Sequence, residues 1–136
     1  MMKKIFILAI LAFGVINFGC DSDCVECEEC DPDEYYVKYE TYGTTRYVGH
    51  NLDISISMEN SEITTFTTGP QGSWETVIGP VKKGFTASIS VETSHTDLTL
   101  EASISVNKND SPFALKASGE SDDLSEPLEI EYTIDF

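Results

Sequence analysis

Three cysteines recur at every third position near the start of the chain: Cys24, Cys27 and Cys30, with Cys20 four residues before the first of them. Thiolates at this spacing can converge on one soft metal ion or on an iron–sulfur cluster. Outside the cytosol, however, such thiols more often form one disulfide with a thiol left over, or cross-link two chains. The adjacent carboxylates also disfavour the thiolate form. We therefore interpret Cys24, Cys27 and Cys30 as structural or incidental, with metal binding as the alternative.

The remaining residue types suggest little catalytic chemistry. His50 and His95 are the only histidines, and neither has a spacing typical of metal ligands. No serine lies in a nucleophile-elbow sequence, so a Ser-His-Asp triad cannot be assembled from the pattern. The acidic segments 107–110 and 122–126 offer oxygen ligands but lack the spacing of a calcium loop. We therefore predict that the protein is not an enzyme and has no cofactor.

Aromatic residues provide the most specific hypothesis for a binding surface. Five tyrosines lie between residues 35 and 47, and in a strand alternate residues face opposite sides. The outward-facing subset would be Tyr36, Tyr42 and Tyr47, which we predict to form a small binding patch. Trp74 could stack on a ligand, but a tryptophan between two chain breaks is more often a core residue.

The first residues have the layout of an export signal. Met1-Met2-Lys3-Lys4 is basic, residues 5–16 are apolar, and Gly19 precedes Cys20. The apolar stretch is shorter than the roughly 20 residues that a membrane-spanning helix needs. We therefore predict that residues 1–19 are removed on export and are not a permanent membrane helix.

Gly19-Cys20 after an aliphatic segment resembles the lipobox of bacterial lipoproteins, especially the relaxed form found in the Bacteroidota. The resemblance implies that Cys20 is acylated and becomes the first mature residue. One acyl chain holds a protein only marginally, whereas two or more attach it stably to a membrane. A secreted protein that is cut near Gly19 and carries no lipid is the alternative.

Residues 20–34 form an acidic, cysteine-rich tether. Eight of the fourteen residues from Asp21 to Glu34 are acidic and none is basic, so this segment should be an extended linker. Acidic residues directly after the lipidated cysteine resemble the signal that sends Bacteroidota lipoproteins to the outer membrane. We therefore expect the outer membrane, on either its periplasmic or its surface face.

Charge excludes one class of partner. The 117 residues after position 19 contain 6 basic and 24 acidic side chains, a net side-chain charge of −18. Such a surface repels nucleic acid and anionic lipid headgroups. We therefore predict no nucleic-acid partner, membrane attachment only through the lipid, and an envelope protein as a possible but unidentified partner.

From Tyr35 onward the apolar residues recur with a period of two, the pattern of strands with one buried face. Turn signals separate these segments about every ten residues, and no helical pattern occurs. The predicted strands are 35–42, 52–58, 62–68, 73–78, 85–91, 98–106, 112–117 and 128–136.

The economical fold for these strands is all-β, an Ig-like antiparallel β-sandwich of about seven or eight strands over residues 35–136. Its predicted core consists of the apolar residues on one side of each strand: Val37, Leu52, Ile54, Ile56, Trp74, Phe85, Ile89, Val91, Leu100, Ile104, Phe113, Leu115, Ile130 and Ile134.

Several short elements in this region resemble small Bacteroidota lipoproteins and, more distantly, the mycobacterial MmpS family of Ig-like β-sandwiches. The elements are Val37-Lys38-Tyr39-Glu40 with Gly43, Trp74, Lys83-Gly84-Phe85, Ile104-Ser105-Val106 and Ala117-Ser118-Gly119. The resemblance implies an accessory role beside an envelope transporter. From the residues alone, the leading hypothesis is a lipid-anchored, non-enzymatic binding or scaffolding module. The transporter accessory and the cysteine metal site are the alternatives.

Overall fold

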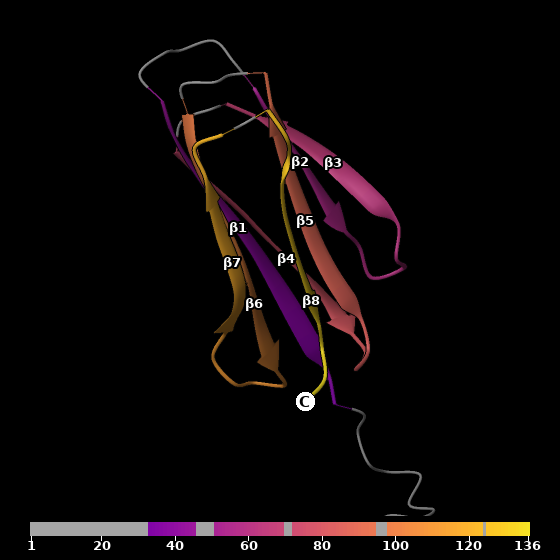
Figure 1. The fold of residues 1–136 in the computed structure, drawn as a ribbon. Helices are drawn as coiled ribbons and strands as arrows, with labels where there is room; N and C mark the ends of the chain where they lie inside the picture. Colours follow the sequence, from indigo (N-terminus) through magenta and orange to yellow (C-terminus); the bar gives the residue numbers. More distant parts are fainter. Residues whose placement is uncertain (1–32, 46–50, 70–71, 95–97, 124) are drawn as a thin grey trace, which may run out of the picture. The chain divides into compact units, whose positions relative to one another are not determined.

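The computed structural model describes residues 33–45, 51–69, 72–94, 98–123 and 125–136. In the described residues the chain forms eight β-strands and no helix (Figure 1). The strands are β1 (Tyr35–Thr45), β2 (Leu52–Ser57), β3 (Ile63–Thr68), β4 (Gly72–Val81), β5 (Thr86–Thr93), β6 (Leu98–Lys108), β7 (Ala114–Ser121) and β8 (Leu128–Thr133).

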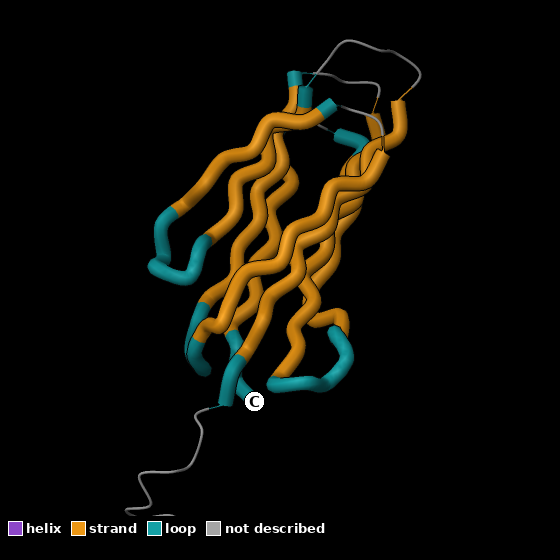
Figure 2. Tube along the Cα trace, turned by 180° about the vertical axis from the view of Figure 1, so that it is seen from behind, coloured by secondary structure: helices purple, strands orange, loops and turns teal. Residues whose placement is uncertain are grey.

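The strands pack as two four-stranded antiparallel sheets. Sheet A has the order β4-β1-β6-β7 and sheet B the order β3-β2-β5-β8. Figure 2 shows the two layers facing each other, with loops at both ends. An all-β antiparallel sandwich was the fold that the period-two pattern predicted, and the structure confirms it.

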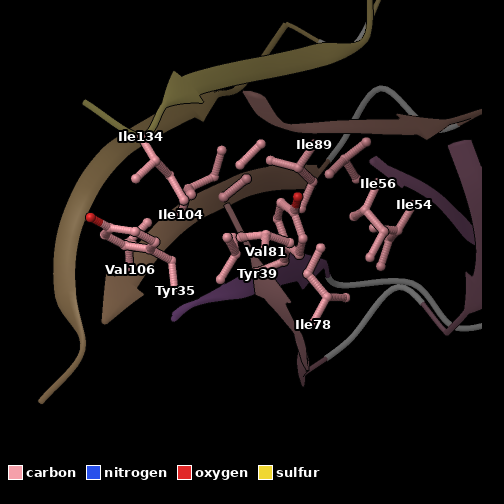
Figure 3. Close-up of a cluster of buried hydrophobic side chains, with 14 of the residues drawn as sticks. Tyr35, Tyr39, Ile54, Ile56, Ile78, Val81, Ile89, Ile104, Val106 and Ile134 are labelled. Atoms are coloured by element: carbon pink, nitrogen blue, oxygen red, sulfur yellow. The ribbon is translucent and has the colours of Figure 1, made fainter. Parts of the chain in front are cut away.

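The core lies between the two sheets, where each strand places alternate side chains (Figure 3). Tyr35, Val37 and Tyr39 of β1 are buried, as the alternation predicts. Three predicted core residues, Trp74, Phe85 and Ile130, are only partly buried against the cluster. The fully buried aliphatic residues are Val37, Leu52, Ile54, Ile56, Ala87, Ile89, Val91, Leu100, Ile104, Val106 and Ile134.

Phe113 and Leu115 were predicted in the core and are not. Phe113 is 38% exposed and Leu115 is 62% exposed. The pairing of β6 with β7 shifts register between Ile104 and Ser105, so that Leu115 lies opposite the outward-facing Ser105. A bulge of this kind reverses the face to which the following side chains point, and this reversal turned Leu115 outward.

The predicted strand 73–78 ends too early, because β4 continues through Gly79 and Pro80 to Val81. The peptide bond before Pro80 is cis, and Gly79 has φ +136°. A Cβ at Gly79 would lie 2.7 Å from Cδ1 of Tyr36 and 2.8 Å from the carbonyl oxygen of Tyr35. Glycine therefore lets β4 stay paired with β1 where a larger residue would clash.

The start of the sandwich is fastened to the turn between β6 and β7. Asp33 forms an ion pair with Lys108 at 2.7 Å. The backbone N–H of Glu34 donates to Oδ1 of Asn109, and the N–H of Asn109 donates to the carbonyl of Glu34. Phe136 lies at the same end, where its carbonyl accepts a hydrogen bond from the Tyr35 hydroxyl.

The described residues, 33–136 with their gaps, belong to one compact unit. Every strand pairing in the described residues joins strands between Tyr35 and Thr133, so the core is complete within this unit. The unit contains no cysteine. We therefore treat residues 31–136 as a domain that folds on its own.

Candidate binding face

The outer face of sheet A has the features of a binding surface. β1 lies inside this sheet and points Tyr36, Lys38, Glu40 and Tyr42 outward. These residues alternate with the buried ones described above. The face is therefore built by the same alternation that fills the core.

A hollow of about 560 Å³ opens on this face near the end of β1. Tyr42 lies in this hollow and is 46% exposed. Cross-strand pairing places Ser73 on one side of Tyr42 and Glu101 on the other, and Glu120 lies beyond Glu101. An aromatic ring is thus flanked by carboxylates and a hydroxyl across four strands.

The next row of residues continues the same chemistry. Glu40 lies between Glu75 of β4 and Ser103 of β6, and Ser118 of β7 follows Ser103. Nζ of Lys38 lies 3.0 Å from Oε1 of Glu40, which neutralises one of these carboxylates. The hollow therefore presents an exposed ring among acidic groups, a setting that favours a cationic group over an anionic one.

The other half of the face is more apolar. Val77, Phe113 and Leu115 are exposed there, and Nζ of Lys38 lies 5.7 Å from the centroid of the Phe113 ring. Lys38 and Leu115 both pair with Ser105. The outer face of sheet A thus has two adjoining regions, an apolar one near Phe113 and an acidic one around Tyr42.

The two described members of the predicted tyrosine patch, Tyr36 and Tyr42, do not lie next to each other. They share the outer face of β1 but are six positions apart along the extended strand, roughly 20 Å. The Tyr36 hydroxyl donates to Oε2 of Glu34, and this hydrogen bond raises the pKa of Tyr36. Only Tyr42 lines the hollow, and Tyr47 lies outside the described residues.

The other predicted site residues take no part in this face. Cys20, Cys24, Cys27 and Cys30 lie outside the described residues, as do His50 and His95. Trp74 packs against Phe66 with ring centroids 5.3 Å apart and is partly buried. It therefore belongs to the sandwich, as predicted, and not to a ligand platform.

The described part of the chain contains no group of three His, Cys, Asp or Glu side chains arranged to hold a metal ion. The predictions about catalysis and about the cysteine metal site therefore stay predictions, because their main residues are not described.

No helix in the described residues is long and apolar enough to cross a membrane.

Sequence reasoning missed the acidic side of the hollow. Glu101 and Glu120 come from β6 and β7, far from Tyr42 in the chain, and only the pairing of the sheet brings them together. The alternation of Glu and Ser in these strands marks their polar faces. It does not reveal which strand lies beside β1.

Neither a protein-family profile nor a curated protein matches the chain. The resemblance to the MmpS family and to Bacteroidota lipoproteins therefore stays a prediction.

Proposed function

We propose that this protein is a cell-envelope lipoprotein whose β-sandwich is a non-enzymatic binding or scaffolding module. A lipid on Cys20 would attach the chain to the outer membrane, and residues 20–34 would separate the sandwich from the lipid surface. The export-signal layout and Gly19-Cys20 support the attachment.

The observation that supports a binding role is the open hollow around Tyr42. The chain enters the sandwich at Asp33, fastened to Lys108. Tyr42 lies seven residues along β1 from Tyr35, roughly 24 Å toward the opposite end of the sheet. A ligand can therefore reach the ring and the carboxylates beside it without meeting the anchored end.

Charge complementarity defines the ligand class. Glu75, Glu101 and Glu120 surround Tyr42 and Glu40 on a chain whose net charge is −16. A lysine, arginine or amine group would gain both the attraction of the carboxylates and a cation–π contact with the ring. The proposed ligand is thus a partner that presents a cationic group.

Mass spectrometry of the mature protein from its native envelope tests the anchor. We expect an N-terminus at Cys20 with acyl chains attached, and a Cys20→Ala variant that no longer fractionates with membranes. A mature chain that begins elsewhere, or an unmodified Cys20, would remove the lipoprotein part of the proposal. Digestion of whole cells with protease then distinguishes the surface face from the periplasmic face.

A further inference from the structure

Strand β3 (Ile63–Thr68) is an open edge of sheet B. Among the described residues its only pairing partner is β2, so the backbone N–H and C=O groups on its other side have no strand beside them. Figure 1 shows β3 at the outer rim of the sandwich. Such an edge is a template for pairing with another extended chain.

The other three edge strands carry groups that oppose such pairing. β4 contains Glu75 and Pro80, β7 contains Glu120, and β8 contains Glu129 and Glu131. Charged residues and proline are the usual protection of an edge strand. β3 contains neither a charged residue nor a proline. It is the edge at which two copies of this acidic chain can meet without placing carboxylates opposite each other.

The side chains of β3 suit an interface. Ile63 is 61% exposed on the outer face, with Thr65 and Thr67 exposed on the same side. On the inner side Phe66 packs against Trp74 at the margin of the core. Threonine and isoleucine have high β propensity and form favourable cross-strand pairs.

We propose that β3 is a self-association edge, at which β3 of a second copy pairs in antiparallel orientation about a two-fold axis. The pair joins the two copies of sheet B into one eight-stranded sheet. The two-fold axis is perpendicular to this joined sheet. The inner and outer faces of the two copies are continuous only if each residue of one β3 lies opposite a residue of the other β3 that points to the same face.

Any axis placed at a residue satisfies this condition, and two such registers pair five of the six residues of β3. With the axis at Thr65, that residue faces its own copy and Ile63 faces Thr67. With the axis at Phe66, the two phenylalanines face each other and Thr65 faces Thr67. In both registers Glu62, just before β3, lies three or four residues from the axis. The two Glu62 side chains are then roughly 20 Å apart or more, beyond the screening length at physiological salt.

The antiparallel arrangement also fixes how the two copies are directed. The axis reverses β3 and with it the whole sandwich, so the two Asp33 entry points lie at opposite ends of the pair. This geometry suits copies that are held on two facing membranes.

Sedimentation analysis of residues 31–136 over a range of concentrations tests the proposal. We expect a monomer–dimer equilibrium that Thr65→Lys weakens at least about tenfold, because a charge is placed at the edge. Thr44→Lys is the matched control, since Thr44 is an exposed threonine on β1, inside sheet A. It should leave the dimer unchanged.

Cysteine cross-linking then locates the contact, because residues 31–136 contain no native cysteine. Under mild oxidation Thr65→Cys alone should form a disulfide-linked dimer if the axis is at Thr65. A mixture of Thr65→Cys and Thr67→Cys should do so if the axis is at Phe66, and Thr44→Cys should not in either case.

Three results would overturn the proposal. If the domain is a monomer at every concentration, β3 does not pair with a second copy, and the edge would instead be a binding site for an extended segment of a different protein. Equal weakening by Thr65→Lys and Thr44→Lys would assign the effect to charge alone. A dimer that persists without either cross-link would place the contact on another surface.

Discussion

The hydroxyl oxygen of Tyr39 lies 3.0 Å from both the carbonyl oxygen and the hydroxyl oxygen of Ser57, which joins β1 of sheet A to β2 of sheet B. The Ser57 hydroxyl in turn donates to the carbonyl of Thr86 and accepts from the N–H of Ser88. Tyr39 and Ser57 are both buried. One polar cluster thus links both sheets inside a mainly apolar core.

Removing either hydroxyl should destabilise the domain to different degrees. Tyr39→Phe should lower the free energy of unfolding by about 1 kcal/mol, because the ring still fills its space and one hydrogen bond is lost. Ser57→Ala should cost more, about 1 to 3 kcal/mol, because it leaves the N–H of Ser88 without its acceptor. Urea unfolding of residues 31–136 measures both. Thr44→Ala on the exposed face is the control and should change stability little. A Ser57→Ala variant as stable as wild type would contradict a structural role for the cluster.

Tyr39 should also cause the free energy of unfolding to fall at alkaline pH. Burial raises the pKa of Tyr39 above its usual value near 10. The folded state therefore keeps the proton after the unfolded chain has begun to lose it. Its contribution to stability is full below about pH 10 and is lost as the pH rises through the folded-state pKa. Urea unfolding from neutral pH to about pH 11 should show a shallower decline in Tyr39→Phe than in wild type.

Tyr36 and Tyr132 also have raised pKa values. The comparison of wild type with Tyr39→Phe therefore separates the contribution of Tyr39 from that of the other two tyrosines. A hydrogen bond to Glu34 causes the shift in Tyr36, and burial causes the shift in Tyr132. Both remain in the variant. Identical pH profiles for wild type and variant would show that Tyr39 does not control the alkaline limit.

Gly79 should be harder to replace than Gly72 and Gly84, the other described glycines with a positive φ. Gly79→Ala places a Cβ within 2.8 Å of backbone and ring atoms at Tyr35 and Tyr36, in addition to the strain of a positive φ. Gly84→Ala provides the control, because Gly84 also has a positive φ but open space around it. We expect a loss of about 1 kcal/mol for Gly84→Ala and distinctly more for Gly79→Ala. Thermal unfolding compares the two, and equal losses would contradict the proposed clash.

The sequence predicts local structure here better than it predicts neighbours. The alternation in Leu52–Ser57 fixes a strand and its buried face, because the period of two is a property of the segment itself. Leu115 shows the limit. Its face depends on a register shift between β6 and β7, which no local pattern encodes. Gly79-Pro80 looks like a break in sequence, yet its conformation is decided by the approach of Tyr35 and Tyr36.

The candidate site was predictable only in part, for the same reason. Tyr42 could be placed on an exposed face from the alternation of β1 alone. Its distance from Tyr36 follows from the strand geometry. Glu101 and Glu120 become its neighbours through pairings between distant segments, and many strand orders are compatible with one sequence.

The hollow around Tyr42 should bind a cationic peptide through the carboxylates that line it, Glu101 and Glu120, and not through the net charge of the domain. Calorimetry at low salt with a short oligolysine probe should give binding that Glu101→Gln/Glu120→Gln weakens severalfold. Glu129→Gln/Glu131→Gln changes the net charge equally but lies on β8 of the other sheet, so it should have little effect. Tyr42→Leu should weaken binding by about two- to fivefold through the lost cation–π contact. Equal effects of the two double variants would refute a specific site.

The self-association edge should cluster membranes when the domain is displayed on vesicles. Residues 30–136 contain a single thiol, Cys30, which allows coupling to a maleimide lipid at the start of the chain. Because the antiparallel pairing of β3 directs the two chain entries to opposite ends, copies on facing vesicles can pair, and turbidity should rise with time. Thr65→Lys should abolish this clustering, whereas Thr44→Lys should retain it. Clustering that is unaffected by Thr65→Lys, or wild-type vesicles that stay dispersed at densities where the free domain dimerises, would show that the two-fold pairing does not direct the chains as described.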